Sequence, residues 1–171
     1  DAVARSQHPS APHALKKPLS APAALPPEER RLKRPESVLV VIYTAMDEVL
    51  VLRRRQPANF WQSVTGSLRW EETDPLAAAR RELREETGLG DGVEVVACGT
   101  INRFPILPPW RHRYAPDVVE NVEHVFRVRL SERPPITLNP AEHSEYCWLV
   151  RAVAATQVTS YTNRNAILRL P

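Results

Sequence analysis

The chain has 171 residues, a mass of 19.4 kDa and a formal net charge of +3. Hydrophobic residues make up 43% and charged residues 25%, a composition that excludes a fibrous or largely disordered protein and predicts a packed domain. No apolar run approaches the roughly 20 residues of a membrane helix, and Cys98 and Cys147 are too few and too far apart for a disulfide framework or a zinc ribbon. We therefore expect a cytoplasmic protein with no membrane partner.

The first 32 residues differ in composition from the rest of the chain. They are rich in proline, alanine and serine without helical or strand periodicity, which predicts a flexible extension or, alternatively, a segment that docks on a partner. The charge excess also lies here, because residues 1–36 carry seven basic and four acidic side chains and leave the remainder neutral. Charge therefore gives no support for nucleic-acid binding by the folded part. Residues 33–171 are expected to form one domain.

A β-hairpin opens the predicted domain. Residues 37–45 (SVLVVIYTA) are a β-branched apolar run of strand length, Met46 and Asp47 suit a turn, and residues 48–54 (EVLVLRR) are a second run. We therefore expect two antiparallel strands here.

The clearest helix follows after a loop. Asp74 suits the N-cap, Pro75 the first helical position, and Gly88 or Gly90 the C-terminal end. Further along, the pattern predicts long strands at residues 93–104 and 118–130, short strands at 134–138 and 142–150, and a helical region at 163–170. Together these elements predict an α+β or α/β domain with a mixed sheet.

Three carboxylates share one face of this helix, because Glu82, Glu85 and Glu86 stand at positions i, i+3 and i+4. Like charges at this spacing repel by about 0.2–0.5 kcal/mol per pair, so the arrangement favours a compensating cation. Oxygen ligands without neighbouring cysteine or histidine favour Mg²⁺ or Mn²⁺ over zinc. The alternative is a solvated face whose glutamates are neutralised by Arg80, Arg81 and Arg84.

The segment around the helix resembles the signature of the Nudix hydrolase family. Residues 81–89 match its second half, Arg-Glu-apolar-x-Glu-Glu-x-Gly-apolar, without exception, and Gly66 and Glu72 resemble the first half. Eight residues rather than seven separate Glu72 from Arg81, an addition that the loop before the helix can absorb, whereas inside the helix it would rotate the carboxylates by about 100°. Other segments resemble the branch of the family that hydrolyses dihydroneopterin triphosphate: KRPESVLVVIY, NFWQSVTGS, RHRYAP, EHSEYCWL and SYTNRNAI.

This resemblance implies a fold and a site. The fold would be the Nudix α/β/α sandwich with a central mixed β-sheet. The metal ligands, for Mg²⁺ or Mn²⁺, would be Glu82, Glu86 and Glu142. The substrate-binding residues would be Lys33, Arg54, Thr65, the loop from Phe104 to Leu107, and Ser160.

The resemblance also implies a reaction, the hydrolysis of dihydroneopterin triphosphate, a small-molecule triphosphate, to the monophosphate and pyrophosphate. Either Glu85 or Glu142 would take the proton from water, and Arg81 would orient Glu85 through an ion pair or form only a surface salt bridge. For His124 and His143 we expect ordinary structural roles. Trp61 could stack on a ring, although we expect Phe60 and Trp61 to fill the core.

Two other functions stay open. One is a MutT-type enzyme that acts on nucleoside triphosphates. The other is a non-catalytic Nudix-fold module that binds RNA or nucleotides through the basic extension. The complete Arg-Glu-Leu-x-Glu-Glu set, beginning at Arg81, argues against a decayed site.

Overall fold

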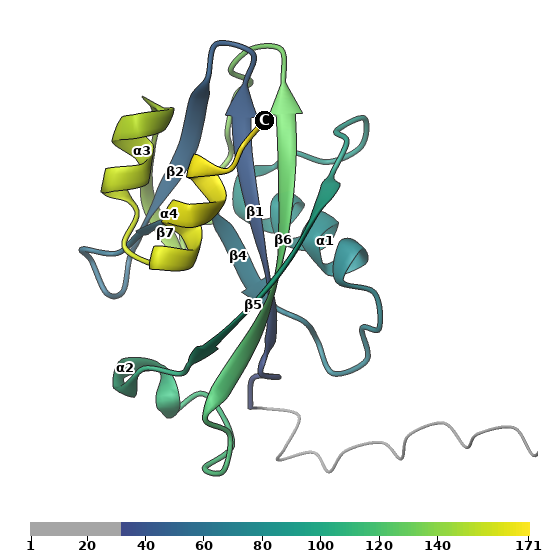
Figure 1. Ribbon diagram of the computed structural model, residues 1–171, viewed down its shortest axis with the longest axis vertical. Helices are drawn as coiled ribbons and strands as arrows, with labels where there is room; N and C mark the ends of the chain where they lie inside the picture. Colours follow the sequence, from purple (N-terminus) through teal and green to yellow (C-terminus); the bar gives the residue numbers. More distant parts are fainter. Residues whose placement is uncertain (1–31) are drawn as a thin grey trace, which may run out of the picture.

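A computed structural model describes residues 32–171, so the extension predicted for residues 1–32 lies outside the described residues except for Leu32. Seven strands form one sheet in the order β3-β2-β1-β6-β5, with β4 paired to β1 and β7 paired to β2 (Figure 1). The strands are β1 (Glu36–Thr44), β2 (Glu48–Arg54), β3 (Trp61–Gln62), β4 (Val64–Ser67), β5 (Val96–Pro105), β6 (Glu120–Leu130) and β7 (His143–Val150). The helices are α1 (Pro75–Thr87), α2 (Pro108–Arg111), α3 (Arg151–Gln157) and α4 (Tyr161–Leu168).

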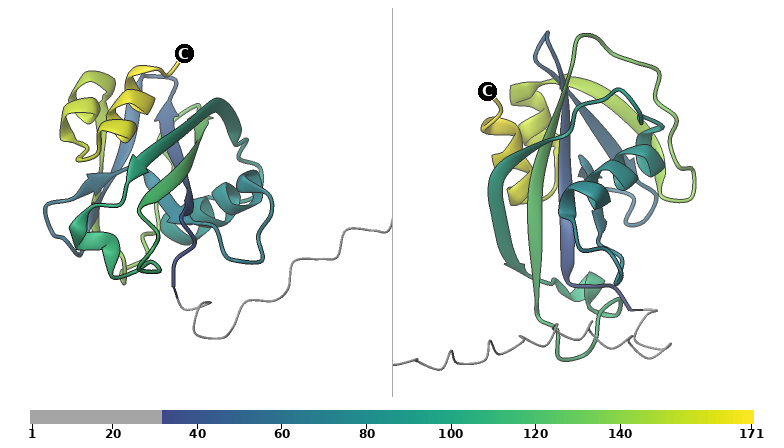
Figure 2. Two further views of the ribbon diagram at one scale, coloured as in Figure 1. Left: turned by 60° about the horizontal axis from the view of Figure 1, so that its bottom comes forward. Right: turned by 90° about the vertical axis from the view of Figure 1, so that its right-hand side faces the viewer.

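Helices cover both faces of this sheet. Helix α1 lies on one face, and α3 and α4 lie on the other (Figure 2). Strand β1 lies in the middle, where it runs parallel to β6 and antiparallel to β2 and β4. Its alternating side chains feed two cores: Val40 packs in the core that contains Leu83 of α1, and Val41 in the core that contains Ile167 of α4. The predicted α/β/α sandwich with a mixed sheet is therefore confirmed.

Local signals at the ends of α1 act as predicted. The Asp74 side chain accepts a hydrogen bond from the Leu76 N–H at 2.9 Å, and Pro75 occupies the first turn. Gly88 ends the helix in the left-handed conformation (φ 75°), which a glycine adopts without steric cost, and its N–H donates to the Arg84 carbonyl. The predicted hairpin, the long strands and the C-terminal helix also form, as β1 and β2, as β5 and β6, and as α4.

The short strand predicted at residues 134–138 is wrong. Among the described residues this segment pairs with no strand, and the Thr137 N–H instead donates to the Thr87 carbonyl at the end of α1. Pro134 and Pro135 have no N–H to give to a sheet. Strands β3 and β4 and helices α2 and α3 were not predicted. None of the helices within residues 32–171 is long and apolar enough to cross a membrane.

Candidate active site

The three glutamates of α1 lie in different environments. Glu82 and Glu86, one helical turn apart, are only 8% and 1% exposed, whereas Glu85 is exposed. The first two therefore face the protein, in contact with β4, and do not form the solvated face that the alternative interpretation required.

Strand β4 approaches α1 so closely at Gly66 that a side chain there would displace the carboxyl group of Glu82. A Cβ atom at Gly66 would lie 2.1 Å from the Cδ and Oε1 atoms of the Glu82 carboxyl group. Glycine at this position is therefore what allows the Glu82 carboxylate to lie against the strand.

Burying two carboxylates side by side makes their charged forms costly. Burial, together with the neighbouring Glu86, raises the pKa of Glu82 to about 7, although Arg81 opposes this shift. Burial also raises the pKa of Glu86 above its ordinary value, against the opposing effect of His143. A cation beside the pair would remove this cost.

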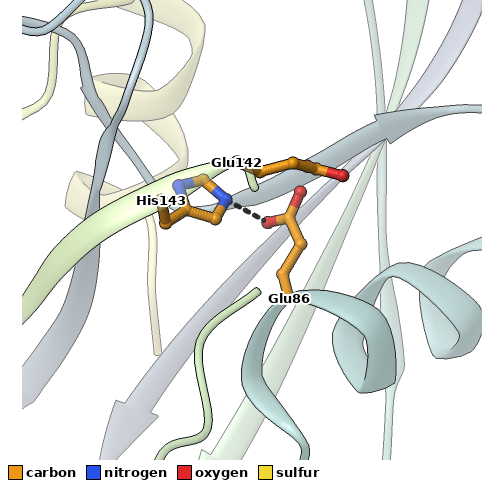
Figure 3. A group of neighbouring side chains, drawn as sticks. All are labelled: Glu86, Glu142 and His143. Atoms are coloured by element: carbon orange, nitrogen blue, oxygen red, sulfur yellow. Dashed lines mark ion pairs between the residues drawn. The ribbon is translucent and has the colours of Figure 1, made fainter. Parts of the chain in front are cut away.

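Strand β7 brings two further ligand groups to Glu86. One ligand atom from each of Glu86, Glu142 and His143 lies within 4.8 Å of the others, and Figure 3 shows the two carboxylates and the imidazole converging from the end of α1 and the start of β7. The His143 Nε2 atom lies 3.4 Å from Glu86 Oε2. Both buried ring nitrogens of His143 lack a hydrogen-bond partner among the described residues, so this set of donors fits a divalent cation.

The predicted metal set of Glu82, Glu86 and Glu142 is therefore brought together in part. Glu86 and Glu142 belong to the cluster just described, whereas the Oε1 atom of Glu82 accepts a hydrogen bond from Arg81 Nη1 at 2.6 Å. Glu82 nevertheless lies near Glu86: both side chains are buried, and the charge of Glu86 acts on the Glu82 carboxyl group.

Arg81 connects the loop before α1 to the carboxylates on it. Its guanidinium binds both oxygens of Glu72, at 2.7 and 3.0 Å, and donates to Glu82, to Glu85 and to the Ser67 carbonyl. Glu72 lies in the loop before α1, which begins at Pro75, and is the bidentate partner of Arg81. This arginine is largely buried, so its contacts are more than a surface salt bridge.

A cavity of about 430 Å³ opens next to these carboxylates. All the residues predicted to bind substrate line it, although they come from distant parts of the chain: Lys33, Arg54, Thr65, Phe104, Leu107 and Ser160. Thr65 connects the two regions, because its N–H donates to Glu86 Oε2 at 3.4 Å. The cavity and the carboxylate cluster are therefore neighbours, joined through Thr65.

Three cations gather at this cavity without an acidic partner. Lys33, Arg54 and Arg113 line it, and none of them forms an ion pair within residues 32–171. Burial, and then the charges of Arg113 and Arg54, lower the pKa of Lys33, although Glu82 and Glu142 oppose this shift. Burial and Arg113 lower the pKa of Arg54, against the effect of Glu86 and Glu142. Such mutual repulsion favours an anionic ligand.

Aromatic rings complete the wall of the cavity. The guanidinium carbons of Arg54 and Arg113 lie 4.9 and 5.0 Å from the centre of the Trp110 ring, and Phe60 meets that ring edge-on at 5.8 Å. Phe60 thus lines the cavity, contrary to the expectation that it fills the core, whereas Trp61 does pack against the core.

Sequence reasoning missed several residues of the site. We expected a structural role for His143, yet it lies against Glu86. Its position directly after the predicted metal ligand Glu142 could have indicated that it lies near the site. Asn121 and Glu123 line the cavity from β6, a strand in which polar and charged residues are common, so their residue types alone did not distinguish them. Trp110 gave no signal, because its contacts depend on how its loop folds back.

Comparison with known proteins gives a consistent result. The NUDIX domain family model matches residues 33–167. The chain is 41% identical over 145 residues to the dihydroneopterin triphosphate diphosphatase of Escherichia coli, covering 82% of this chain and 94% of that protein. It is 37% identical over 139 residues to the enzyme of the same name from Haemophilus influenzae, covering 79% of this chain and 86% of that protein.

A solved structure agrees with the sequence matches. The E. coli dihydroneopterin triphosphate pyrophosphohydrolase superposes with a TM-score of 0.76 at 40% identity, and the match covers 81% of this chain and 96% of that one. A NUDIX hydrolase from Listeria monocytogenes shares the fold at 24% identity, with a TM-score of 0.67 and coverage of 79% and 90%.

Proposed function

Because the chain belongs to the Nudix family of hydrolases, we propose that it hydrolyses dihydroneopterin triphosphate to dihydroneopterin monophosphate and pyrophosphate. The observation that carries this proposal is the likeness to the E. coli diphosphatase along almost its whole length. The site supports it chemically, since unpaired cations line a cavity beside paired buried carboxylates.

The chain's own residues would bind the polyphosphate at the cationic end of the cavity. Arg54 and Arg113 offer planar guanidinium groups that can each bind two phosphate oxygens, and Lys33 offers a point charge. Trp110 contacts both guanidiniums, which limits their freedom before the substrate arrives. Binding here places the phosphate chain beside Thr65 and the α1 carboxylates.

Glu86 and Glu142, which lie together, and Glu82, one helical turn from Glu86, would hold a divalent ion. We propose Mg²⁺ or Mn²⁺ because these three ligands offer carboxylate oxygens. Such an ion, when bound, offsets the charge of the leaving pyrophosphate and makes a nearby water more acidic. The His143 ring is fully buried with its Nε2 3.4 Å from Glu86 Oε2, so it would limit the positions that the Glu86 carboxylate can take.

The proton of the attacking water would pass to a carboxylate. Glu85 is already engaged, because its two oxygens accept hydrogen bonds from Arg69 at 3.0 Å and Arg81 at 3.1 Å. Glu142 lies with Glu86 and accepts only a long hydrogen bond from the Asn139 amide, at 3.3 Å, among the described residues. We therefore favour Glu142 over Glu85, with Arg81 as the group that holds Glu85 and Glu82 in place. The Glu85→Gln variant should then keep most of the wild-type kcat, and the Glu142→Gln variant should lose it.

A substrate panel tests the proposed function. We expect kcat/KM to be highest for dihydroneopterin triphosphate when it is compared with the common dNTPs and oxidised purine nucleoside triphosphates. Faster turnover of any of these would establish the MutT-type alternative, and binding without any turnover would establish the non-catalytic module.

The boundaries of the catalytic unit can be tested in the same assay. Every residue that lines the cavity lies between Lys33 and Arg164, so we propose that residues 33–171 suffice and that deletion of residues 1–30 leaves turnover unchanged. We also propose that the enzyme works in the cytoplasm, where Cys98 and Cys147, both unpaired, would stay reduced.

A further inference from the structure

Polar side chains face the cavity where the sheet should be apolar. Asn121 and Glu123 stand two residues apart on β6, so both point to the same face, and they are only 3% and 5% exposed. In the sheet register Glu123 lies between Ser37 of β1 and Asn102 of β5. All but Asn102 line the cavity, so we call Ser37, Asn121 and Glu123 its polar floor. Buried polar groups on a central strand require partners.

Only one of the two polar atoms of the Asn121 amide has a hydrogen-bond partner among the described residues. Its Nδ2 donates to Ser37 Oγ at 2.7 Å. Its buried Oδ1 has no hydrogen-bond partner among residues 32–171. An acceptor that is buried and unpaired beside a cavity is suited to a ligand that donates a hydrogen bond.

Glu123 is a buried carboxylate without a cation. Its Oε1 accepts a hydrogen bond from Asn102 Nδ2 at 3.1 Å, and it forms no ion pair within the described part of the chain. Burial raises its pKa, while the Asn102 and Thr162 side chains beside it act in the opposite direction. A glutamine could make the contact with Asn102 equally well, so that contact does not require a carboxylate. A ligand that donates two adjacent N–H groups would require one.

We propose that Asn121 and Glu123 bind the ring of the substrate through its N–H donors and thereby select a 2-amino-4-oxo pyrimidine edge. This inference rests on the proposed function, because phosphates at Lys33, Arg54 and Arg113 leave the polar floor for the ring. The edge presents an amino group next to a ring N–H, and a carboxylate accepts both at once. Pterins and guanine carry this edge; adenine and 2,4-dioxopteridine (lumazine) do not. Asn121 and Glu123 are thus specificity-determining residues.

The test compares two ligands that differ only at ring position 2. Pterin and lumazine are titrated into the full chain by NMR, with wild type and Glu123→Gln in parallel. We expect wild type to bind pterin about 10- to 100-fold more tightly than lumazine, the range for hydrogen bonds to a charged group. The Glu123→Gln variant should lose this preference, because the NH₂ group of its amide would face an N–H donor of the pterin ring. Glu120→Gln, an exposed carboxylate at the start of the same strand, is the matched control and should keep it.

Folding and function are separated by further measurements. Thermal unfolding shows whether Glu123→Gln is folded; Asn121→Ser, which removes the unpaired acceptor, is titrated alongside and should also reduce the preference for pterin. If both folded variants keep the wild-type preference while wild type hydrolyses dihydroneopterin triphosphate, the ring site is refuted and the proposed function stands. If the variants lose the preference while wild type hydrolyses no pterin triphosphate, the ring site is upheld and the proposed function fails.

Discussion

Replacing Glu86 by glutamine removes one negative charge from the most buried part of the carboxylate cluster. Glu86 is 1% exposed, lies beside His143, and accepts a hydrogen bond from the Thr65 N–H. Glutamine has nearly the same shape and keeps an oxygen for Thr65, so the fold should be preserved. Because burial raises the pKa of Glu86, the metal-free variant should be at least as stable as wild type.

The effect on ion binding should be large. An ion present at a hundred times its Kd stabilises the folded state by about 2.7 kcal/mol. For a domain of this size, that corresponds to a rise in Tm of roughly 5–11 °C. The Glu86→Gln variant should lose most of this rise. Its kcat should fall by more than about 100-fold, since removal of groups that only support metal ligands already costs about 10- to 100-fold.

The assay is differential scanning fluorimetry with and without MgCl₂, together with pyrophosphate release. Glu132→Gln is the matched control, because Glu132 is an exposed carboxylate just after β6 and makes no contact with the cluster. A Glu86→Gln variant that kept both the Mg²⁺-dependent rise in Tm and the wild-type kcat would refute the role of Glu86 as a ligand.

Three further predictions concern the surroundings of the helix. Gly66→Ala should lower kcat/KM by about 10- to 100-fold, because the added Cβ would displace the Glu82 carboxylate. Gly90→Ala is the control and should leave kcat/KM unchanged, because its Cβ meets only the flexible Arg84 side chain. Burial and Glu86 raise the pKa of Glu82 from 4.5 to about 7, so in the presence of chelator its contribution to stability is complete below about pH 4.5 and is lost as the pH rises through 7. The Glu82→Gln variant should therefore lose about 3 kcal/mol of the pH dependence of the free energy of unfolding, measured in urea. An unchanged pH dependence would contradict this prediction. Arg81→Lys should lower the free energy of unfolding by about 1–3 kcal/mol, because lysine cannot bind both oxygens of Glu72; wild-type stability would show that the bidentate pair contributes nothing.

Features encoded by neighbouring residues could be predicted from the sequence. Asp74, Pro75 and Gly88 define the ends of α1 through bonds within a few residues, and the spacing of Glu82 and Glu86 places both on one face of that helix. Gly66 could be matched to a family pattern, but its reason, the contact with the Glu82 carboxylate, appears only when β4 and α1 pack together.

Features that depend on tertiary contacts could not be predicted in this way. His143 lies beside Glu86 because β7 pairs with β2 and so brings its first residue to the end of α1. The segment at 134–138 has strand-like residues, yet its two prolines leave it with a single hydrogen bond to Thr87. Asn121 could be read as a polar residue in a strand, whereas its unpaired oxygen depends on the position of Ser37.

The most direct measurement is product identification by ³¹P NMR after dihydroneopterin triphosphate is incubated with the full chain, once with Mg²⁺ and once with excess chelator. We expect pyrophosphate and dihydroneopterin monophosphate in equal amounts with Mg²⁺, and intact triphosphate with chelator. Release of orthophosphate, or hydrolysis that continues undiminished in chelator, would contradict the assignment of the buried carboxylates to an ion that acts on the polyphosphate.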